Sequence, residues 1–292
     1  MNTNATPPVT VQYGSISVDG LNIFFRHAGN PAHPAFVLLH GFPSSSHMYR
    51  DLIPLLAQRF HVIAPDYVGF GYSDAPAPEH FEYSFASLTD VVERFLAKLK
   101  VDRYHLYMQD YGGPIGLRIA AKHPERVLGL VVQNANAYME GVSQAAADVF
   151  MPLWQKGDET GARQMLLAAT TKFQYTQGAR NPAGLNPDAW THDQALLDRP
   201  GNADLQMALF KDYQTNVASY DAWHAYFRAY QPRTLVLWGQ GDPFFTVQGA
   251  EAFRRDLQHV ELHLLASGHF ALEEDSELIA NHINRFFQAQ NL

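Results

Sequence analysis

The sequence predicts an α/β protein with a mostly parallel, twisted sheet that helices flank, and with a helical lid inserted between two sheet strands. Three observations lead to this fold class. Apolar runs typical of buried strands alternate with helical periodicity over residues 1–132. This alternation stops over residues 133–232 and resumes from residue 233. The 292 residues are 47% hydrophobic and 17% charged, which is enough apolar material for a large core.

The first part of the chain supplies most of the expected strands. Val9–Val18 and Leu21–Phe25 are β-type stretches separated by a turn-like Asp19-Gly20. Phe36–Leu39 is an apolar run of the kind found in strands that are buried on both faces. Further along we expect, in order, a helix over His47–Ala57, a strand over Phe60–Ala64, a helix that Ser84 caps and that runs to Lys100, a strand over Tyr104–Met108, a helix over Gly112–Lys122 and a strand over Val127–Val132.

The middle of the chain contains helix-like stretches broken by glycine and proline, and no obvious strand before Pro232. The strand and helix pattern then returns, with a strand over Thr234–Trp238, a helix near Val247–Leu257, a strand over Val260–Leu265 and a last helix whose apolar face carries Ile279, Ile283, Phe286 and Phe287. We therefore expect a core domain of residues 1–132 and 233–292, and a lid of residues 133–232 that covers a pocket.

Charge, cysteine content and hydropathy exclude several classes of protein. The net charge is −8 and no basic run follows a phosphate backbone, so nucleic acid is not an expected partner. The absence of cysteine excludes disulfides, thiolate catalysis and zinc–thiolate sites. No apolar run approaches the roughly 18 residues of a membrane span, and the first residues lack the features of a signal peptide. We expect no membrane partner and a cytoplasmic location, while the oligomeric state stays open.

Three polar residues follow strands at the same edge of the expected sheet. Asp110 follows the strand over Tyr104–Met108, Asp242 comes after Thr234–Trp238, and His269 comes after Val260–Leu265. Ligands of doubly wound sheets bind at the carboxyl ends of the strands, so the three side chains are expected to converge on one pocket. Their order along the chain is nucleophile, acid, histidine, which is the order in α/β-hydrolases.

Five short motifs carry a specific resemblance, because they occur in order at family-like spacing: HGFP (His40–Pro43), PDYVGFGYSD (Pro65–Asp74), QDYGG (Gln109–Gly113), GDPF (Gly241–Phe244) and GHF (Gly268–Phe270). With these motifs the chain resembles the α/β-hydrolase fold family, and within it the branch of epoxide hydrolases and haloalkane dehalogenases. The resemblance implies a hydrolase that needs no cofactor and that uses an aspartate as its nucleophile.

Asp110 stands where serine hydrolases of this fold place their nucleophile. A serine that attacked saturated carbon would leave an ether, whereas a carboxylate leaves an ester whose carbonyl belongs to the enzyme and can be hydrolysed. We expect the backbone N–H groups of Phe42 and Tyr111 to form an oxyanion hole and to keep Asp110 ionised. His269 would then activate water, and Asp242 would orient it.

A second carboxylate competes for the role of the acid. Glu140 follows the strand over Val127–Val132, where some haloalkane dehalogenases carry their acid. Asp242 is favoured because the GDPF turn has no other explanation.

The residues that stabilise the leaving group decide between epoxides and haloalkanes. Dehalogenases that resemble this chain have a tryptophan directly after the nucleophile, where Tyr111 stands here, and some have an asparagine at the position of Phe42. Only Trp154, in the expected lid, remains as a halide donor. Epoxide hydrolases instead use lid tyrosines as acids toward the ring oxygen, and Tyr213 in DYQTNV resembles their tyrosine motif. The partner tyrosine is not selected by the sequence; the candidates are Tyr111, Tyr138 and Tyr175.

The substrate is expected to be small, neutral and hydrophobic. Haloacid dehalogenases of this fold carry arginines just after the nucleophile, but the first arginine here is Arg118, one helical turn further on. No metal is expected, because His259 and His263 share a strand face without a carboxylate to complete a metal site. The leading prediction is an epoxide hydrolase that forms a diol, and the alternative is a haloalkane dehalogenase. A luciferase-like oxidoreductase without cofactor and a non-catalytic ligand receptor are further alternatives.

Overall fold

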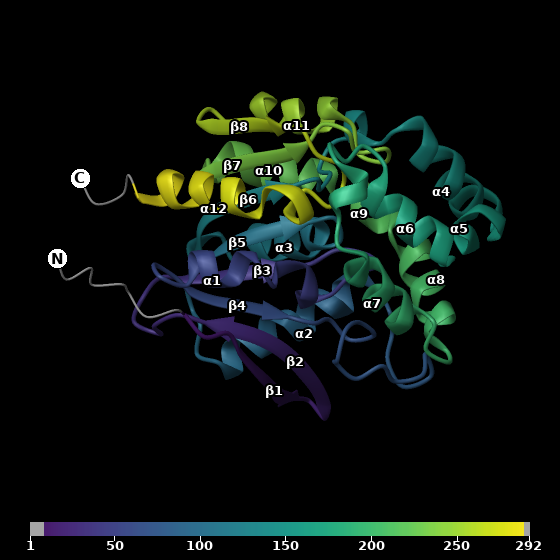
Figure 1. Cartoon of the computed structure of the whole chain (residues 1–292), viewed down its shortest axis with the longest axis horizontal. Coiled ribbons are helices and arrows are strands. Elements are labelled where there is room, and N and C mark those ends of the chain that lie inside the picture. The colour runs from purple at the N-terminus through teal and green to yellow at the C-terminus, as the bar shows by residue number, and fades with distance from the viewer. Residues whose placement is uncertain (1–8, 289–292) are drawn as a thin grey trace.

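A computed structural model of the protein describes residues 9–288, and the sheet at its centre has eight strands in the order β1-β2-β4-β3-β5-β6-β7-β8. All neighbours from β4 to β8 pair in parallel, whereas β1 pairs with β2 and β2 pairs with β4 in the antiparallel sense. Figure 1 shows the strands fanning through the middle of the molecule with helices in front and behind. The predicted mostly parallel α/β sheet is confirmed.

The elements follow the expected order along the chain. The strands are β1 Gln12–Val18, β2 Leu21–Ala28, β3 Ala35–Leu39, β4 His61–Pro65, β5 Tyr104–Gln109, β6 Val127–Gln133, β7 Thr234–Gly239 and β8 Val260–Leu265. The helices that accompany the sheet are α1 Leu52–Leu56, α2 Phe85–Lys98, α3 Gly112–Lys122, α11 Val247–Ala252 and α12 Leu272–Gln288. The expected strand boundaries agree with these to within a few residues.

Both faces of the sheet are buried, and β3 shows how one strand serves them. Val37 and Leu39 belong to the core cluster that includes α2 and α3, whereas Phe36 and Leu38 belong to the cluster that includes α1 and α12. Successive side chains of a strand point to opposite faces, so an all-apolar strand needs helices on both sides. This is why Phe36–Leu39 is an unbroken apolar run.

Two expected helices are each divided in the structure. The stretch His47–Ala57 forms a 3₁₀ helix, η1, over Ser46–Tyr49 and then α1. The Arg50 N–H donates to the carbonyl of His47, three residues back, so this first turn is too tight to continue as an α-helix. The stretch Val247–Leu257 likewise forms α11 and then a 3₁₀ turn, η5, over Phe253–Arg255. A 3₁₀ turn has almost the same apolar spacing as an α-helix, so the sequence pattern does not separate them.

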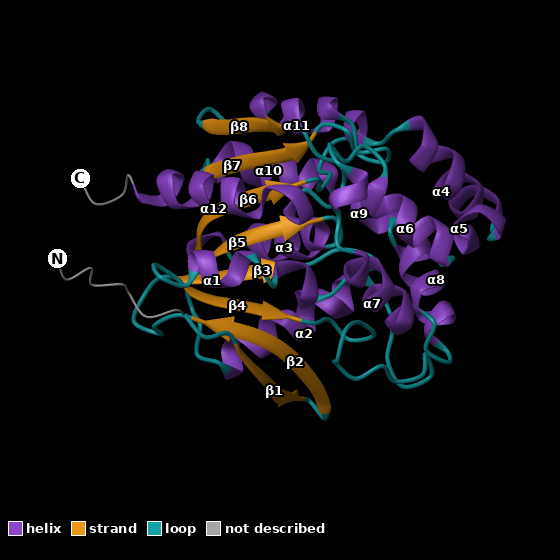
Figure 2. Ribbon diagram, viewed as in Figure 1, coloured by secondary structure: helices purple, strands orange, loops and turns teal. Residues whose placement is uncertain are grey.

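The segment between β6 and β7 is helical, and we call residues 134–233 the helical insertion. It contains α4 Gln144–Lys156, α5 Thr160–Gln164, α6 Ala168–Thr176, α7 Pro187–Leu197, α8 Asn202–Asp212, α9 Gln214–Ala218 and α10 Tyr220–Tyr230. Figure 2 shows α4 to α8 gathered beyond the carboxyl ends of the parallel strands. Within residues 9–288, no helix is both long and apolar enough to cross a membrane.

Candidate active site

Asp110 occupies a strained turn between β5 and α3. Its backbone φ is +49°, a left-handed conformation that residues other than glycine rarely adopt. The chain turns sharply here because α3 packs directly against β3. A Cβ added at Gly112 would lie 2.0 Å from the backbone oxygen of Leu39, so glycine is required at that position. The turn lifts the Asp110 carboxylate above the edge of the sheet, as strained strand-to-helix turns do for nucleophiles.

Backbone donors hold one oxygen of this carboxylate. The N–H of Phe42 donates to Asp110 Oδ1 at 2.7 Å. The backbone N–H of Tyr111 also acts on this carboxylate, since it lowers the pKa of Asp110. The structure therefore brings together the two N–H groups that the sequence predicted as an oxyanion hole. The other oxygen, Oδ2, lies 4.0 Å from His269 Nε2.

The pKa of Asp110 lies above its ordinary value. Burial is the largest cause, since only 8% of the residue is exposed and the charged form loses hydration. The nearby His269 and the N–H groups of Phe42 and Tyr111 act in the opposite direction. Burial thus opposes the backbone donors that are expected to keep Asp110 ionised, and the donors limit the rise in its pKa.

His269 and Asp242 form the second half of the site. The Nδ1–H of His269 donates to Asp242 Oδ2 at 2.7 Å. The backbone N–H groups of Phe244 and Phe245 donate to Asp242 Oδ1 at 2.8 and 3.0 Å, because the GDPF turn wraps around the carboxylate. Asn134 Nδ2 adds a bond of 2.8 Å to Oδ2. These four donors fix the Asp242 carboxylate, which in turn orients the imidazole of His269.

Two opposing effects act on the pKa of His269. Burial lowers it, but the charge of Asp242, the hydrogen bond to Asp242 and the charge of Asp110 raise it, and the net result is a pKa above the ordinary value. The imidazolium is therefore stabilised by carboxylates on both sides of the ring.

Sequence reasoning missed two amide residues beside His269 and Asp242. Asn134 directly follows β6 and joins Asp242 to β7 through the N–H and C=O of Gly239. Gln109, the last residue of β5, places its Nε2 3.0 Å from His269 Nε2. The available signal was position, since both residues stand at the carboxyl end of a parallel strand, where the other site residues also lie.

Glu140 is separated from this arrangement. Its side chain pairs with Arg255, and its backbone oxygen accepts the hydroxyl of Thr246. His269 Nδ1 has Asp242 as its partner, so the geometry supports Asp242 as the acid and leaves Glu140 a surface ion pair.

A cavity lies over Asp110 and His269, between the sheet edge and the helical insertion. The residues that line it are Phe42, Asp110, Tyr111, Val142, Ala146, Phe150, Trp154, Met165, Gln174, Phe210, Tyr213, Phe244, Phe245 and His269. Most of these side chains are apolar, and aromatic rings form much of the wall. The cavity thus suits a neutral and largely hydrophobic molecule.

The predicted leaving-group residues differ in what their polar atoms contact. Trp154 lines the cavity, but its indole N–H donates to the backbone oxygen of Phe210 at 2.8 Å and so is not directed at a ligand. Tyr213 lines the cavity and stacks with Trp154 at a centroid distance of 6.1 Å. Tyr111 also lines it, and its buried hydroxyl has no hydrogen-bond partner among the described residues.

The other two candidate tyrosines have partners elsewhere. The hydroxyl of Tyr138 donates to Asp256 Oδ2 at 2.9 Å, and that of Tyr175 donates to Asp193. Neither is among the residues that line the cavity. Of the three partner candidates, only Tyr111 is therefore placed to act beside Tyr213.

The expectation that no carboxylate accompanies His263 is wrong. Glu261, His263 and His282 form a group whose ligand-type atoms lie within 4.8 Å of one another, while His259 is outside it. The Arg285 guanidinium lies in the middle of this group and donates to Glu261 at 2.7 Å. Because a cation already occupies the centre, we interpret the group as an ion-pair network.

Comparisons with known proteins agree with the geometry. A family model for the alpha/beta hydrolase fold matches residues 34–276. An uncharacterized hydrolase of Saccharomyces cerevisiae is 39% identical over 275 residues, which cover 92% of this chain and 94% of that protein. Haloalkane dehalogenase 2 of Mycobacterium tuberculosis is 42% identical over 101 residues, or 35% of each chain.

Among solved structures, the epoxide hydrolase CorEH matches the fold with a TM-score of 0.80 at 18% identity, over 96% of this chain and 99% of that one. The family match, the yeast relative and the sheet order all support the resemblance that the five motifs predicted. The chain is a hydrolase that belongs to the α/β-hydrolase family.

Proposed function

We propose that the protein opens a neutral, hydrophobic epoxide to a diol through a covalent ester on Asp110. The observation that carries this proposal is the placement of Asp110, with Oδ1 bound by the Phe42 N–H at 2.7 Å and Oδ2 beside His269 in an apolar cavity. A carboxylate held in this way can attack with Oδ2 while Oδ1 remains in the oxyanion hole. The helical insertion acts as the lid of this cavity.

In the first step, Asp110 Oδ2 attacks a ring carbon of the epoxide. The carbon–oxygen bond of the ring breaks, its electron pair passes to the ring oxygen, and a tyrosine hydroxyl gives that oxygen a proton. Tyr111 and Tyr213 are the donors we assign, because both line the cavity and their ring centroids lie 6.0 Å apart. Burial raises the pKa of both hydroxyls, so each stays protonated until the ring oxygen gains negative charge. Proton transfer therefore accompanies ring opening.

In the second step, neutral His269 takes a proton from water, and the hydroxide attacks the ester carbonyl of Asp110. Negative charge develops on Oδ1, where the Phe42 and Tyr111 N–H groups stabilise it. The ester bond breaks, and the departing alkoxide takes the proton from the imidazolium to complete the diol. The proton of the new Asp110 carboxyl group returns to the tyrosinate, which restores both residues.

The test is to remove water activation and look for the ester. We expect His269→Gln to react once with an epoxide and to retain a mass increase equal to the substrate on the peptide that carries Asp110, as mass spectrometry measures. Asp110→Asn is the matched control and should show no adduct. Absence of an adduct with every epoxide and 1-haloalkane tried would overturn the proposal.

The second candidate is a haloalkane dehalogenase. It is favoured by the QDYGG motif and by the partial identity to haloalkane dehalogenase 2 of Mycobacterium tuberculosis, but the engaged N–H of Trp154 leaves the halide without an indole donor. Halide release without diol formation would select it. Light emission or oxygen uptake without an adduct would indicate a luciferase-like oxidoreductase, and ligand binding without turnover would indicate a receptor.

A further inference from the structure

Gln174 is a buried amide in the cavity wall that the proposed reaction does not use. It lies on α6, is 2% exposed, and lines the same cavity as Asp110 and His269. Its Nε2 has no hydrogen-bond partner among the residues that the structure describes. The cavity therefore contains an amide donor that comes from the helical insertion and is separate from the nucleophile, the histidine and the two tyrosines.

Three other polar side chains on the same helix have hydrogen-bond partners. The hydroxyl of Thr171 donates to Gln194 Oε1 at 2.6 Å, that of Tyr175 donates to Asp193, and that of Thr176 donates to the backbone oxygen of Lys172 at 2.9 Å. A buried donor without a protein partner destabilises the fold, whereas an apolar side chain of the same length would not. The side-chain amide of Gln174 on this helix is thus unsatisfied, and it lies at the cavity.

Aromatic contacts place α6 on the histidine side of the site. Phe173 contacts Phe244 at a centroid distance of 6.2 Å, and Phe244 in turn contacts His269. Tyr111 and Tyr213 instead contact Phe85 at 4.8 and 5.5 Å. The two tyrosines that protonate the ring oxygen and the helix that carries Gln174 therefore belong to different aromatic groups around the cavity.

We propose that Gln174 is a specificity-determining residue whose Nε2 donates a hydrogen bond to a second oxygen of the substrate, apart from the epoxide oxygen. The substrate class is then a neutral epoxide that carries an ether, carbonyl or hydroxyl oxygen near the ring, and not a plain hydrocarbon epoxide. This inference rests on the proposed function, since it names the substrate class of the same site. A site that contains a buried donor discriminates against a ligand that lacks the matching acceptor.

Butyl glycidyl ether and 1,2-epoxyoctane test the inference, because they have the same chain length and differ by one oxygen in place of a methylene. We expect the wild type to favour the ether in kcat/KM, and Gln174→Met to reduce this preference about fivefold to tenfold, the effect of losing one hydrogen bond. Turnover of 1,2-epoxyoctane should be retained. Gln177→Met, the same substitution at an exposed position three residues on, is the matched control and should keep the preference.

Two results would overturn the inference. One is an ether preference that Gln174→Met leaves unchanged or that the wild type lacks. The other is an equal loss for both probes with accumulation of the Asp110 ester, which would assign Gln174 to the water of the second step.

Binding separates this test from that of the reaction. In an Asp110→Asn background, calorimetry measures the affinity for each probe without turnover. If His269→Gln forms no adduct with any epoxide, the proposed function fails, yet tighter binding of the ether that Gln174→Met abolishes would still support the role of Gln174. Equal binding of both probes would overturn that role even if both are hydrolysed.

Discussion

His269 lies between two carboxylates that change differently during the proposed reaction. Asp242, 2.7 Å from Nδ1, forms no covalent bond to the substrate, whereas Asp110, 4.0 Å from Nε2, becomes a neutral ester after the first step. Because the charge of Asp110 contributes to the raised pKa of His269, ester formation lowers that pKa. The neutral imidazole that the second step requires is thus favoured at the stage when it is needed.

Asp110→Asn mimics this loss of charge and should lower the pKa of His269 in the free protein. Titration of the His269 ring protons by NMR measures the shift without any substrate. Asp102→Asn, an exposed substitution at the opposite end of β5, should leave the titration unchanged. An unaltered His269 titration in Asp110→Asn would contradict the coupling.

The sign of the linked stability change follows from the same pKa. A histidine whose folded pKa is raised contributes stability that is fully present below about pH 6.5 and is lost as the pH rises through the folded pKa. Asp110→Asn weakens the part of this contribution that comes from Asp110, so its unfolding free energy should depend less on pH in this window.

The sequence identified the residues whose chemistry stands out and missed those that act as amides. Asp110, Asp242 and His269 could be placed because each follows a strand within a motif of restricted composition. Gln174 carries no such signal, and Gln109 belongs to the QDYGG motif without a role that the motif assigns, since an amide in a strand or helix is common and its role depends on the partner it faces. Only the packed structure shows that Gln109 contacts His269 and that Gln174 Nε2 has no hydrogen-bond partner within residues 9–288.

At the scale of elements, the order of strands and helices was predictable, but the division of the helical insertion was not. The central strands β3 and β7 are buried along their whole length, so each is a distinct apolar run in the sequence. α5 and α9 have only five residues each, too few to show a helical period, and they are held by contacts with longer helices. Residues 133–232 as a separate lid domain stay a prediction.

The tight junction of β5, α3 and β3 makes a testable element-scale prediction. Gly112→Ala should destabilise the protein by at least about 2 kcal/mol in chemical unfolding, because the new methyl group meets the Leu39 backbone oxygen at 2.0 Å and backbone cannot yield cheaply.

Gly157→Ala is the control for this substitution. A Cβ added at Gly157 has no atom within 4 Å, so strain arises only from the backbone φ of +70°. We expect the free energy of unfolding to fall by about 1 kcal/mol. If Gly112→Ala costs no more than Gly157→Ala, close packing does not explain the glycine.

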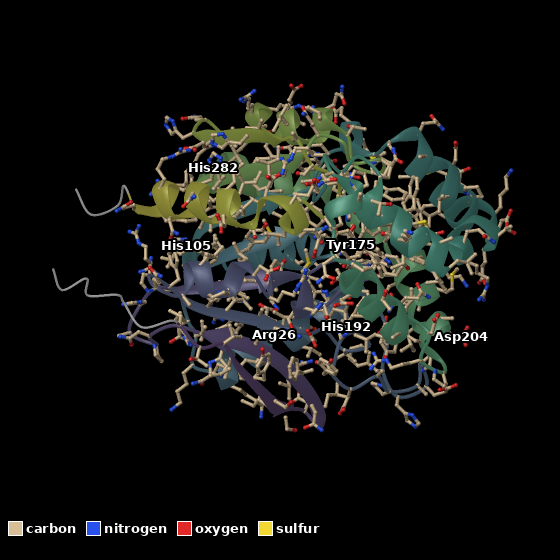
Figure 3. All side chains as sticks on the ribbon, in the orientation of Figure 1. Arg26, His105, Tyr175, His192, Asp204 and His282 are labelled. Carbon is tan, nitrogen blue, oxygen red and sulfur yellow. The ribbon has the colours of Figure 1, made fainter. Side chains whose placement is uncertain are left out.

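At the scale of the whole molecule, the helical insertion contacts the core at Phe270, the residue after His269. The ring of Tyr175, on α6, stacks on Phe270 at a centroid distance of 3.8 Å, and Figure 3 shows Tyr175 where the insertion meets the sheet edge. The hydroxyl of Tyr175 donates to Asp193 on α7, which is fully buried. A titratable carboxyl group is therefore enclosed at the contact between the insertion and the core.

Asp193 should make the stability of the protein fall as the pH rises. Burial raises its pKa to about 7, against an ordinary value of 3.8, so the folded state binds the proton more tightly than the unfolded chain does. The unfolding free energy then decreases between about pH 4 and pH 7, as this carboxyl group becomes charged in the interior.

Asp193→Asn keeps the shape and an acceptor for Tyr175 without the charge. It should match the wild type near pH 4 and exceed it at pH 8 by on the order of 4 kcal/mol. Thermal and urea unfolding across this range measure the difference. Asp188→Asn, an exposed substitution in the first turn of α7, is the control, and its unfolding free energy should depend on pH as that of the wild type does. The same pH dependence in Asp193→Asn would show that the Asp193 carboxyl group does not set it.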